Sequence, residues 1–474
     1  MHRTKIVATI GPDTRTPVSL LALKDAGMSM VRLNGSHNSL DWHDATIAMV
    51  REVLPGVPVL LDIPGRKIRT TDLAVEPSFE AGDTVVLTTE PDHDGAHKVP
   101  VNKPDLHKHL KAGNRILADD GTLSFTVHEV DGRDIVCRAE TGGTLRSRKG
   151  INVPFVKLES ELVTQRDRDM VAFAVDNGVD FIGISFVESA DHVAAIRELI
   201  DGSFPRIISK IENQGGLDHM DEIMETTDGA MIDRGDLSVE TNFEELALFQ
   251  KRILQSAERH SKPVIVATEM LHSMITNANP TKAELCDISN AVLDGCSATM
   301  LSGETAVGAY PREAVATMRK VADSAEAHRQ SDLEREASAN HTASPEVMSQ
   351  AIAMICRSLP ITKIVAVTRS GYAARMIAAR HPKQPIIAVS DDAAAARSFN
   401  LYRGTEGVHV DVPFERKSTD HIVQCLKELW RQDYLEDEDL ILVTAVGYPH
   451  AGNRMNHIQT HIVADLKDTL DWQR

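Results

Sequence analysis

The chain has 474 residues, which is too long for one ordinary hydrophobic core and indicates two to four domains. Hydrophobic residues make up 42% and charged residues 25%, as in a folded soluble protein, and no apolar run approaches the roughly 18–20 residues that span a bilayer. The formal net charge of −18 argues against a nucleic-acid partner, so we expect neither nucleic-acid nor membrane binding.

The amino terminus and the cysteines favour a cytoplasmic location. The first residues lead directly into an apolar strand, without the apolar core of a signal peptide. The five cysteines are odd in number, scattered and without a paired metal-ligand spacing: Cys137, Cys286, Cys296, Cys356 and Cys425. We therefore expect reduced thiols in a cytosolic compartment.

Eight short apolar runs of strand length recur along the chain, each followed by a longer stretch with helical periodicity. These runs are Ile6–Ile10, Met30–Leu33, Val59–Ile63, Phe181–Ser185, Ile207–Ile211, Ala230–Ile232, Val264–Ala267 and Ala298–Leu301. Most are continuous Val, Ile and Leu runs, which is typical of buried parallel strands. Eight successive strand–helix units predict a (β/α)8 TIM barrel formed by residues 1–70 and 152–330.

The barrel is expected to carry an inserted domain after its third strand. The third and fourth strands start at residues 59 and 181, whereas the other strand starts lie 22 to 35 residues apart. Residues 71–151 are rich in Val, Thr, Gly and Asp, with short alternating runs such as Thr84–Thr88 and Leu123–Val127. This pattern predicts a small all-β domain, which we expect to be a β-barrel that covers the mouth of the TIM barrel as a lid.

A separate α/β domain is expected at residues 343–474. The preceding segment Ser331–Ala343 is polar and charged and indicates a linker. Beyond it the pattern predicts a helix over Glu346–Arg357 and strands at Ile364–Val367, Ile386–Val389 and Leu440–Thr444. We expect these strands to form a mostly parallel sheet.

Polar side chains follow most of the predicted barrel strands, where a TIM barrel carries its functional residues. They are Arg32, Asn34, Ser36, Asp62, Lys67, Arg69, Ser185, Lys210, Glu212, Arg234, Asp236, Thr268, Ser302 and Glu304. A single polar loop residue indicates little. Several cations and carboxylates at the strand ends of one barrel indicate a site for an anionic substrate.

The fifth predicted strand is the most informative. Lys210 and Glu212 are two residues apart, so both face one side of the strand. Such a pair can be a structural ion pair without function. In the functional interpretation Glu212 binds a divalent cation and Lys210 faces a transferring phosphoryl group, with Asp236 as a second carboxylate ligand.

Several segments resemble those of pyruvate kinases. They are Lys5–Pro12, Val31–His37, Asp119–Gly121, Ile207–Asn213, Asp228–Asp236, Val264–Met274 and Ala291–Thr305, with weaker likeness at Thr368–Gly371 and Leu401–Gly404. The motifs occur in the family's order from residue 4 to about residue 320. The resemblance implies phosphoryl transfer from phosphoenolpyruvate to ADP, giving pyruvate and ATP, with Mg²⁺ or Mn²⁺ as cofactor.

The resemblance also implies roles for single residues at the reaction centre. Lys210 matches the lysine that stabilises the transition state, and Glu212 and Asp236 match the Mg²⁺ ligands. Gly235, with Asp236, matches the backbone that holds the pyruvate carboxylate. Thr268 matches the threonine near the enolate carbon.

Other matches concern the phosphate, the nucleotide and a monovalent cation. Arg32 and Ser185 would contact the substrate phosphate. The positions that match the nucleotide side are Asn34, His37, Arg69 and Lys149, with Lys149 reaching in from the lid. The positions that match ligands of a monovalent cation are Asn34, Ser36 and Asp62.

Lys67 distinguishes two types within the family that it resembles. Members that need K⁺ usually carry glutamate at this position, whereas members that do without K⁺ carry lysine. The ammonium group of Lys67 would replace the charge of K⁺, as in K⁺-independent bacterial pyruvate kinases. K⁺ is therefore not expected to be required.

The C-terminal domain is expected to hold an effector site. The turn Thr368, Arg369, Ser370 and Gly371 follows a strand and precedes a helix, where backbone N–H groups can bind phosphate. It resembles the family's effector site for a sugar phosphate or AMP, although an ordinary strand–helix turn is an equal alternative. The resemblance also implies a homotetramer.

Some positions depart from the family pattern. Asp233 stands where alanine is usual, and its carboxylate should repel an anionic substrate unless a cation pairs with it. Glu269 replaces a glutamine and Ser238 a glycine, and Ile63, Pro64 and Arg66 also differ. The alternative to an active kinase is a catalytically weak or non-catalytic relative that senses a phosphorylated metabolite.

Overall fold

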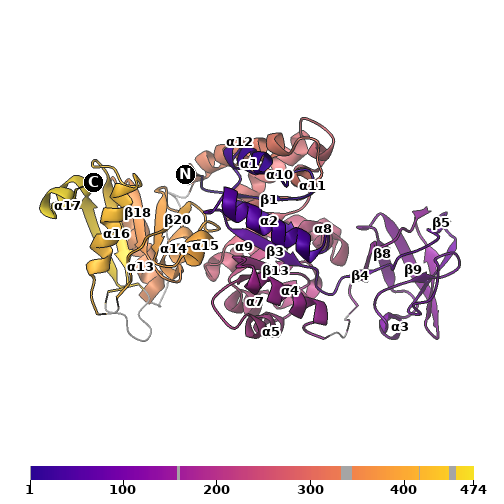
Figure 1. The fold of residues 1–474 in the computed structure, drawn as a ribbon. Coiled ribbons are helices and arrows are strands. Elements are labelled where there is room, and N and C mark those ends of the chain that lie inside the picture. Colours follow the sequence, from indigo (N-terminus) through magenta and orange to yellow (C-terminus); the bar gives the residue numbers. More distant parts are fainter. Residues whose placement is uncertain are drawn as a thin grey trace.

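The computed structural model describes residues 2–156, 158, 161–332, 344–415, 417–447 and 455–473. A central barrel lies between an all-β domain on one side and an α/β domain on the other (Figure 1). None of the helices in this part of the chain has the length and apolar character to cross a membrane.

Eight parallel strands close into the central barrel, so the predicted TIM barrel is confirmed. They are β1 (Lys5–Thr9), β2 (Met30–Asn34), β3 (Val59–Ile63), β13 (Phe181–Ile184), β14 (Arg206–Ile211), β15 (Gly229–Asp233), β16 (Val264–Ala267) and β17 (Ala298–Leu301). Every strand lies within one residue of the predicted run. Once β4–β12 are left out, neighbours in the barrel follow chain order.

The period of two along each strand sends alternate side chains into the barrel. Leu60, Ile208 and Met231 belong to the apolar cluster inside it, and the alternate residues pack outward against the helices. Two residues further along these same strands stand Asp62, Lys210 and Asp233. The barrel interior therefore changes from apolar to charged at the carboxyl ends of the strands, which form the barrel mouth.

The helices cover the outside of the barrel (Figure 1). They are α1 (Pro17–Asp25), α2 (Leu40–Val53), α4 (Gln165–Asp176), α5 (Ala190–Ile200), α6 (Gln214–Asp218), α7 (Met220–Thr226), α8 (Arg234–Glu240), α9 (Leu246–Arg259), α10 (Lys282–Leu293), α11 (Gly303–Ala306) and α12 (Pro311–Asp332). Short 3₁₀ helices occur at Phe243–Glu245 and His272–Ile275. A capping box between Thr281 and Glu284 starts α10, and Pro311 takes the first position of α12.

The inserted domain is all-β, as predicted. Its strands are β4 (Ile68–Arg69), β5 (Ser78–Phe79), β6 (Thr84–Thr88), β7 (Val99–Pro100), β8 (Arg115–Ala118), β9 (Leu123–Asp131), β10 (Asp134–Ala139), β11 (Gly143–Thr144) and β12 (Gly150–Asn152), with one short helix, α3 (Leu106–His109). Seven of them form one sheet that begins with β4 and ends with β7, and β5 pairs with β11. A single bridge between Thr70 and Val101 joins the two edges, so the sheet curls toward a barrel.

The C-terminal domain is an α/β domain with a five-stranded sheet. Its elements are α13 (Ser344–Ser358), β18 (Lys363–Val367), α14 (Tyr372–Ala378), β19 (Ile386–Ser390), α15 (Ala393–Phe399), β20 (Thr405–His409), α16 (Asp420–Arg431), β21 (Leu440–Ala445), β22 (His457–Ile462) and α17 (Val463–Thr469). Four strands are parallel, and β22 pairs antiparallel with β21. The predicted helix and three strands are confirmed.

The predicted linker, Ser331–Ala343, lies largely outside the described residues. Its first two residues still belong to α12. The barrel and the C-terminal domain nevertheless contact each other directly, because Arg403 forms a buried ion pair with Glu326 of α12, and the half-buried Arg397 pairs with the buried Asp180. These pairs fix the C-terminal domain against the amino-terminal face of the barrel.

Candidate active site

The reaction centre is assembled from the ends of neighbouring strands in the barrel mouth. Asp62 accepts hydrogen bonds from Nε and Nη2 of Arg32 at 3.0 and 2.8 Å, and both side chains are buried. Gly183 makes room for this pair, because a Cβ there would lie 2.1 Å from Oδ1 of Asp62. Both bonds go to Oδ2 of Asp62, and these two charge-assisted bonds hold the Arg32 guanidinium at a fixed place in the mouth.

Lys210 lies at the centre of the mouth. Its Nζ is 2.6 Å from Oε1 of Glu212, 3.2 Å from Oδ2 of Asp233 and 3.2 Å from Oγ of Ser185. Burial by itself lowers the pKa of a lysine, but the Glu212 and Asp233 carboxylates outweigh it and raise the pKa of Lys210 above its ordinary value. Lys210 is therefore a permanent, preorganised positive charge.

Three carboxylates converge beside Lys210. Oxygen atoms of Glu212, Asp233 and Asp236 all lie within 4.8 Å of one another. Burial raises the pKa of Glu212 and of Asp236, whereas Lys210 and Lys67 outweigh burial at Asp233 and lower its pKa. Crowded, buried carboxylates of this kind form a donor set that suits a hard divalent cation.

Lys67 reaches the same cluster from the loop after β3. Its Nζ is 2.5 Å from Oδ1 of Asp236 and 3.8 Å from Oδ1 of Asp120 in the inserted domain. Burial opposes the charge, but these two carboxylates raise the pKa of Lys67. Asp62, which was predicted to share a cation site with Asn34 and Ser36, also accepts from Arg32 through Oδ2, whereas its Oδ1 has no hydrogen-bond partner among the described residues.

Thr268 closes the mouth on the side of β16. Its hydroxyl accepts a hydrogen bond from the backbone N–H of Gly235 at 2.9 Å. Thr268 and Glu269 both have positive φ angles, 67° and 55°, which are rare for residues other than glycine. Two successive strained residues at a strand end are typical of a functional turn.

Comparison with known proteins agrees with this geometry. The model of the pyruvate kinase barrel domain matches residues 1–315, and that of the pyruvate kinase alpha/beta domain matches residues 346–460. The chain belongs to the pyruvate kinase family. Its activity is that of a pyruvate kinase, transfer of a phosphoryl group from phosphoenolpyruvate to ADP to give pyruvate and ATP.

Relatives match over nearly the whole chain. The pyruvate kinase of Geobacillus stearothermophilus is 38% identical over 98% of this chain and 81% of its own length. The pyruvate kinase of Clostridium acetobutylicum is 35% identical over 98% of this chain and 100% of its own. Pyruvate kinase 2 of a Synechocystis strain is 37% identical over 94% and 76%, respectively.

The residues that match the family's nucleotide side lie at the rim of the mouth. The Asn34 side chain accepts a hydrogen bond from the backbone N–H of Ser36 at 3.1 Å. Burial, followed by the charges of Arg69 and Arg32, lowers the pKa of His37, so these three residues are close enough to interact electrostatically. Lys149 extends from the inserted domain and forms an ion pair with Asp119 at 2.7 Å.

The inserted domain touches the barrel beside the carboxylate cluster. The Asn152 side chain donates a hydrogen bond to Glu240 of α8 at 2.6 Å, and Lys67 contacts Asp120. These polar contacts, together with Gly121 beside Val239, connect the inserted domain to the helix that carries Asp236. The inserted domain, which is the candidate lid, is therefore in direct contact with the helix that carries the candidate metal ligand Asp236.

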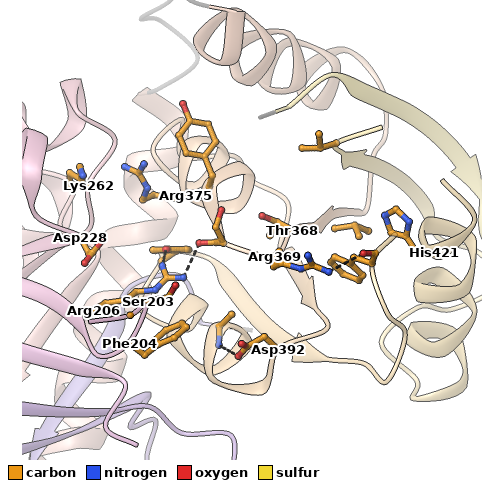
Figure 2. A pocket seen from close by; sticks show the side chains of 18 of the residues that line it. Ser203, Phe204, Arg206, Asp228, Lys262, Thr368, Arg369, Arg375, Asp392 and His421 are labelled. Atoms are coloured by element: carbon orange, nitrogen blue, oxygen red, sulfur yellow. Dashed lines mark hydrogen bonds between the residues drawn. The ribbon is translucent and has the colours of Figure 1, made fainter. Parts of the chain in front are cut away.

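Thr368, Arg369 and Ser370 of the predicted effector turn line a cavity that is separate from the barrel mouth. This interdomain pocket has a volume of about 850 Å³ and lies between the barrel and the C-terminal domain. Figure 2 shows Arg206, Asp228 and Lys262 on the barrel side and Thr368, Arg369 and Arg375 on the C-terminal side. The backbone N–H of Gly371 donates to Thr368 Oγ1, and Arg206 donates to the carbonyl of Ser370 at 2.8 Å.

Some functional neighbours could not be expected from the sequence. Asp233 was expected to repel an anionic substrate unless a cation pairs with it. Lys210 is such a cation, since it forms an ion pair with Asp233. Arg234 donates to both carboxylate oxygens of Asp287 and to the Thr268 carbonyl. Asp287 lies on α10, more than 50 residues further along the chain, and no local sequence pattern encodes a contact between residues so far apart.

Proposed function

We propose that the transfer requires Mg²⁺ or Mn²⁺, held by Glu212 and Asp236 at the barrel mouth. The convergence of these carboxylates beside a buried lysine is the observation that carries the proposal. A bound divalent cation would neutralise charge on the transferring phosphoryl group and on the substrate oxygens. The alternative is a catalytically weak or non-catalytic relative that senses a phosphorylated metabolite. It predicts little or no turnover, even though the carboxylates that would bind the cation are present.

The residues around the cluster position and stabilise the reacting groups. Lys210 places an ammonium where the phosphoryl oxygens gather negative charge, and Arg32 and Ser185 hold the substrate phosphate. The backbone at Gly235 and Asp236 receives the pyruvate carboxylate, with the Asp236 N–H as donor, because the Gly235 N–H donates to Thr268. Since phosphoryl transfer asks mainly for positioning and fixed charge, these groups supply what the step needs.

Thr268 serves the second half of the reaction, in which the enolate carbon gains a proton. Its hydroxyl accepts a hydrogen bond from the Gly235 N–H, on the side of the mouth where we place the carboxylate of pyruvate. A side chain held in a strained turn keeps its orientation without further ordering when substrate binds. Thr268 therefore orients the proton donor, an ordered water, against the enolate.

The inserted domain acts as a lid over the nucleotide side. Asn34, His37 and Arg69 contact ADP from the barrel rim, and Lys149 exchanges its Asp119 partner for the nucleotide phosphates. Closure excludes water and protects the phosphoryl group from hydrolysis. The contacts of Asp120 and Asn152 with the barrel guide the lid to the cluster.

Lys67 makes K⁺ unnecessary by supplying its charge from the chain. Its ammonium neutralises Asp236 at 2.5 Å, and the Asn34, Ser36 and Asp62 group does not need to be filled. A tethered ammonium costs some side-chain entropy but cannot dissociate.

The interdomain pocket binds a phosphorylated effector, a sugar phosphate or AMP. The turn Thr368–Gly371 leads into α14, and the pocket adds guanidinium groups from both domains. Arg206 and Arg375 cross from one domain to the other, so a ligand there would bias their relative position. We expect a cytoplasmic homotetramer, as the family implies.

A coupled assay tests the proposed function. The purified chain should form pyruvate from phosphoenolpyruvate and ADP with Mg²⁺ or Mn²⁺ present, and lose this activity when a chelator removes the cation. Activity that survives complete removal of divalent cations would contradict the role of Glu212 and Asp236. No activity with the cation present would favour the sensor alternative.

A further inference from the structure

Asp233 stands level with Glu212 on the neighbouring strand. The parallel register pairs Lys210 with Met231 and Ile211 with Ile232, so Glu212, the residue after β14, is opposite Asp233. Met231 belongs to the apolar cluster inside the barrel, and Asp233 follows it by two residues, so both face the interior. The Asp233 carboxylate is thus aimed into the mouth and not toward the surrounding helices.

The three carboxylates are close enough to share one cation. Their nearest oxygens lie within 4.8 Å of one another. Magnesium–oxygen distances of about 2.0–2.1 Å place two ligand oxygens at most about 4.2 Å apart. At most one of the three pairs can take this opposed arrangement, and oxygens of adjacent ligands lie roughly 3 Å apart. The side chains of Glu212, Asp233 and Asp236 therefore need to close by about an ångström or two to reach ligand distances.

The charges of the cluster do not balance among the described residues. When all three carboxylates are ionised, as ligands of a cation are, Glu212, Asp233 and Asp236 bring three negative charges, and Lys210 and Lys67 bring two positive ones. The guanidinium of Arg32 already pairs with Asp62 through two hydrogen bonds, and that of Arg234 pairs with Asp287. One buried negative charge remains uncompensated, which is costly unless a cation binds.

We propose that Asp233 is a third carboxylate ligand of the divalent cation, in addition to Glu212 and Asp236. This inference rests on the proposed metal site and deepens it. It assigns a purpose to the residue that stands where alanine is usual in the pyruvate kinase pattern. A third anionic ligand lets the chain bind a divalent cation tightly before either substrate arrives.

Binding of Mn²⁺ to the full-length chain, without substrates, tests the proposal by calorimetry. Asp233→Asn keeps the shape of the side chain and removes its charge, and we expect at least ~10-fold weaker Mn²⁺ binding. Asp294→Asn is the matched control, because it removes a negative charge that pairs with Lys251, away from the barrel mouth, and has no oxygen in the cluster. It should change Mn²⁺ binding by less than about twofold.

A ligand exchange gives a second measurement. Asp233→Cys offers a soft thiolate, so this variant should bind Cd²⁺ with more thiolate-to-metal absorption than the wild-type chain, in which Cys286 is an exposed free thiol. Unchanged Mn²⁺ affinity in Asp233→Asn, with no such increase in absorption in Asp233→Cys, would overturn the inference. If the wild-type chain itself binds no Mn²⁺ and turns over without it, the proposed metal site fails instead.

Discussion

The barrel mouth and the interdomain pocket both collect positively charged side chains, but they hold them differently. In the mouth, Lys210 and Arg32 are buried and pair with carboxylates on adjacent strands of one closed barrel. In the pocket, Arg206 and Arg375 cross between two domains and donate to backbone carbonyls. Figure 2 shows these side chains reaching the cavity from opposite sides.

The difference matches the two roles proposed above, catalysis in the mouth and regulation in the pocket. Charges fixed by strand register keep their geometry whatever the domains do, which suits transition-state stabilisation. Charges that span two domains keep theirs only while the domains hold one relative position. A ligand in the pocket can therefore shift a domain equilibrium, whereas a substitution in the mouth acts on the reaction itself.

The largest effect is expected at the centre of the mouth. Lys210→Met should lower kcat by at least ~10²–10³-fold, the range for loss of one preorganised charge donor. Steady-state kinetics with phosphoenolpyruvate, ADP and saturating Mg²⁺ measure it. Wild-type-like turnover would remove Lys210 from the mechanism.

Lys5→Met is the matched control for that variant. Lys5 is an equally buried lysine at the opposite end of barrel strand β1, where it donates to the Thr405 carbonyl. Its loss should leave kcat within about twofold, since no reacting group lies at that end of a TIM barrel. Equal losses in both variants would mean that a buried lysine matters only for folding.

Charge at the edge of the mouth should have a smaller effect. Wild-type activity should be substantial in buffers free of K⁺ and NH₄⁺ and change little when K⁺ is added. Lys67→Glu places a carboxylate beside Asp236 and should lower K⁺-free activity roughly tenfold, with partial recovery in K⁺.

Lys103→Glu is a control for the change of net charge alone, because Lys103 lies in the inserted domain and pairs with Asp105. This variant should not respond to K⁺. Strict K⁺ dependence of the wild-type chain would contradict the interpretation of Lys67.

The sequence alone predicted the strands of the barrel and most of the charged residues in its mouth, and the same pattern explains both. Buried parallel strands are continuous apolar runs, and functional residues follow their carboxyl ends, so one pattern locates both. Lys210 and Glu212, two residues apart on one strand, were expected to share a face and do so. The ion pair between Arg32 and Asp62 was not predicted, because it joins side chains of two different strands and depends on their orientation in space.

Less could be predicted where apolar patterning is weak. The strands β20 and β22, with the sequences TEGVH and HIQTHI, lie at the two edges of the C-terminal sheet and carry few apolar residues, so no run marked them. The interdomain pocket was missed for a different reason. Its walls come from segments that lie more than 100 residues apart, and no local pattern encodes their meeting.

In the pocket, ligand binding should depend on the turn before α14. Thermal-shift screening with sugar phosphates and AMP should find a ligand that raises Tm by a few degrees, roughly the effect of a ligand at tenfold its Kd. Ser370→Glu should abolish the shift by adding a negative charge to the turn. Ser370→Ala should retain it, and a flat screen would leave this turn as ordinary connecting structure.

The smallest expected effect is a pH dependence of effector binding that originates at Lys262. This side chain lines the pocket and donates to the Thr227 carbonyl. Burial, followed by the charge of Arg375, lowers the pKa of Lys262 to about 8. A lysine is charged below its pKa, so the pocket loses one positive charge as the pH rises through about 8. A phosphate monoester is already dianionic there, because its second pKa is about 6.

Binding of a sugar phosphate should therefore weaken several-fold from about pH 7 to about pH 9, as followed by calorimetry. Lys262→Arg keeps its charge across this range and should flatten the profile. The unfolded chain binds the proton of Lys262 more tightly, so this residue should also make the fold more stable as the pH rises from about 8 toward about 10.5. An identical decline of binding in both proteins would exclude Lys262 from the site.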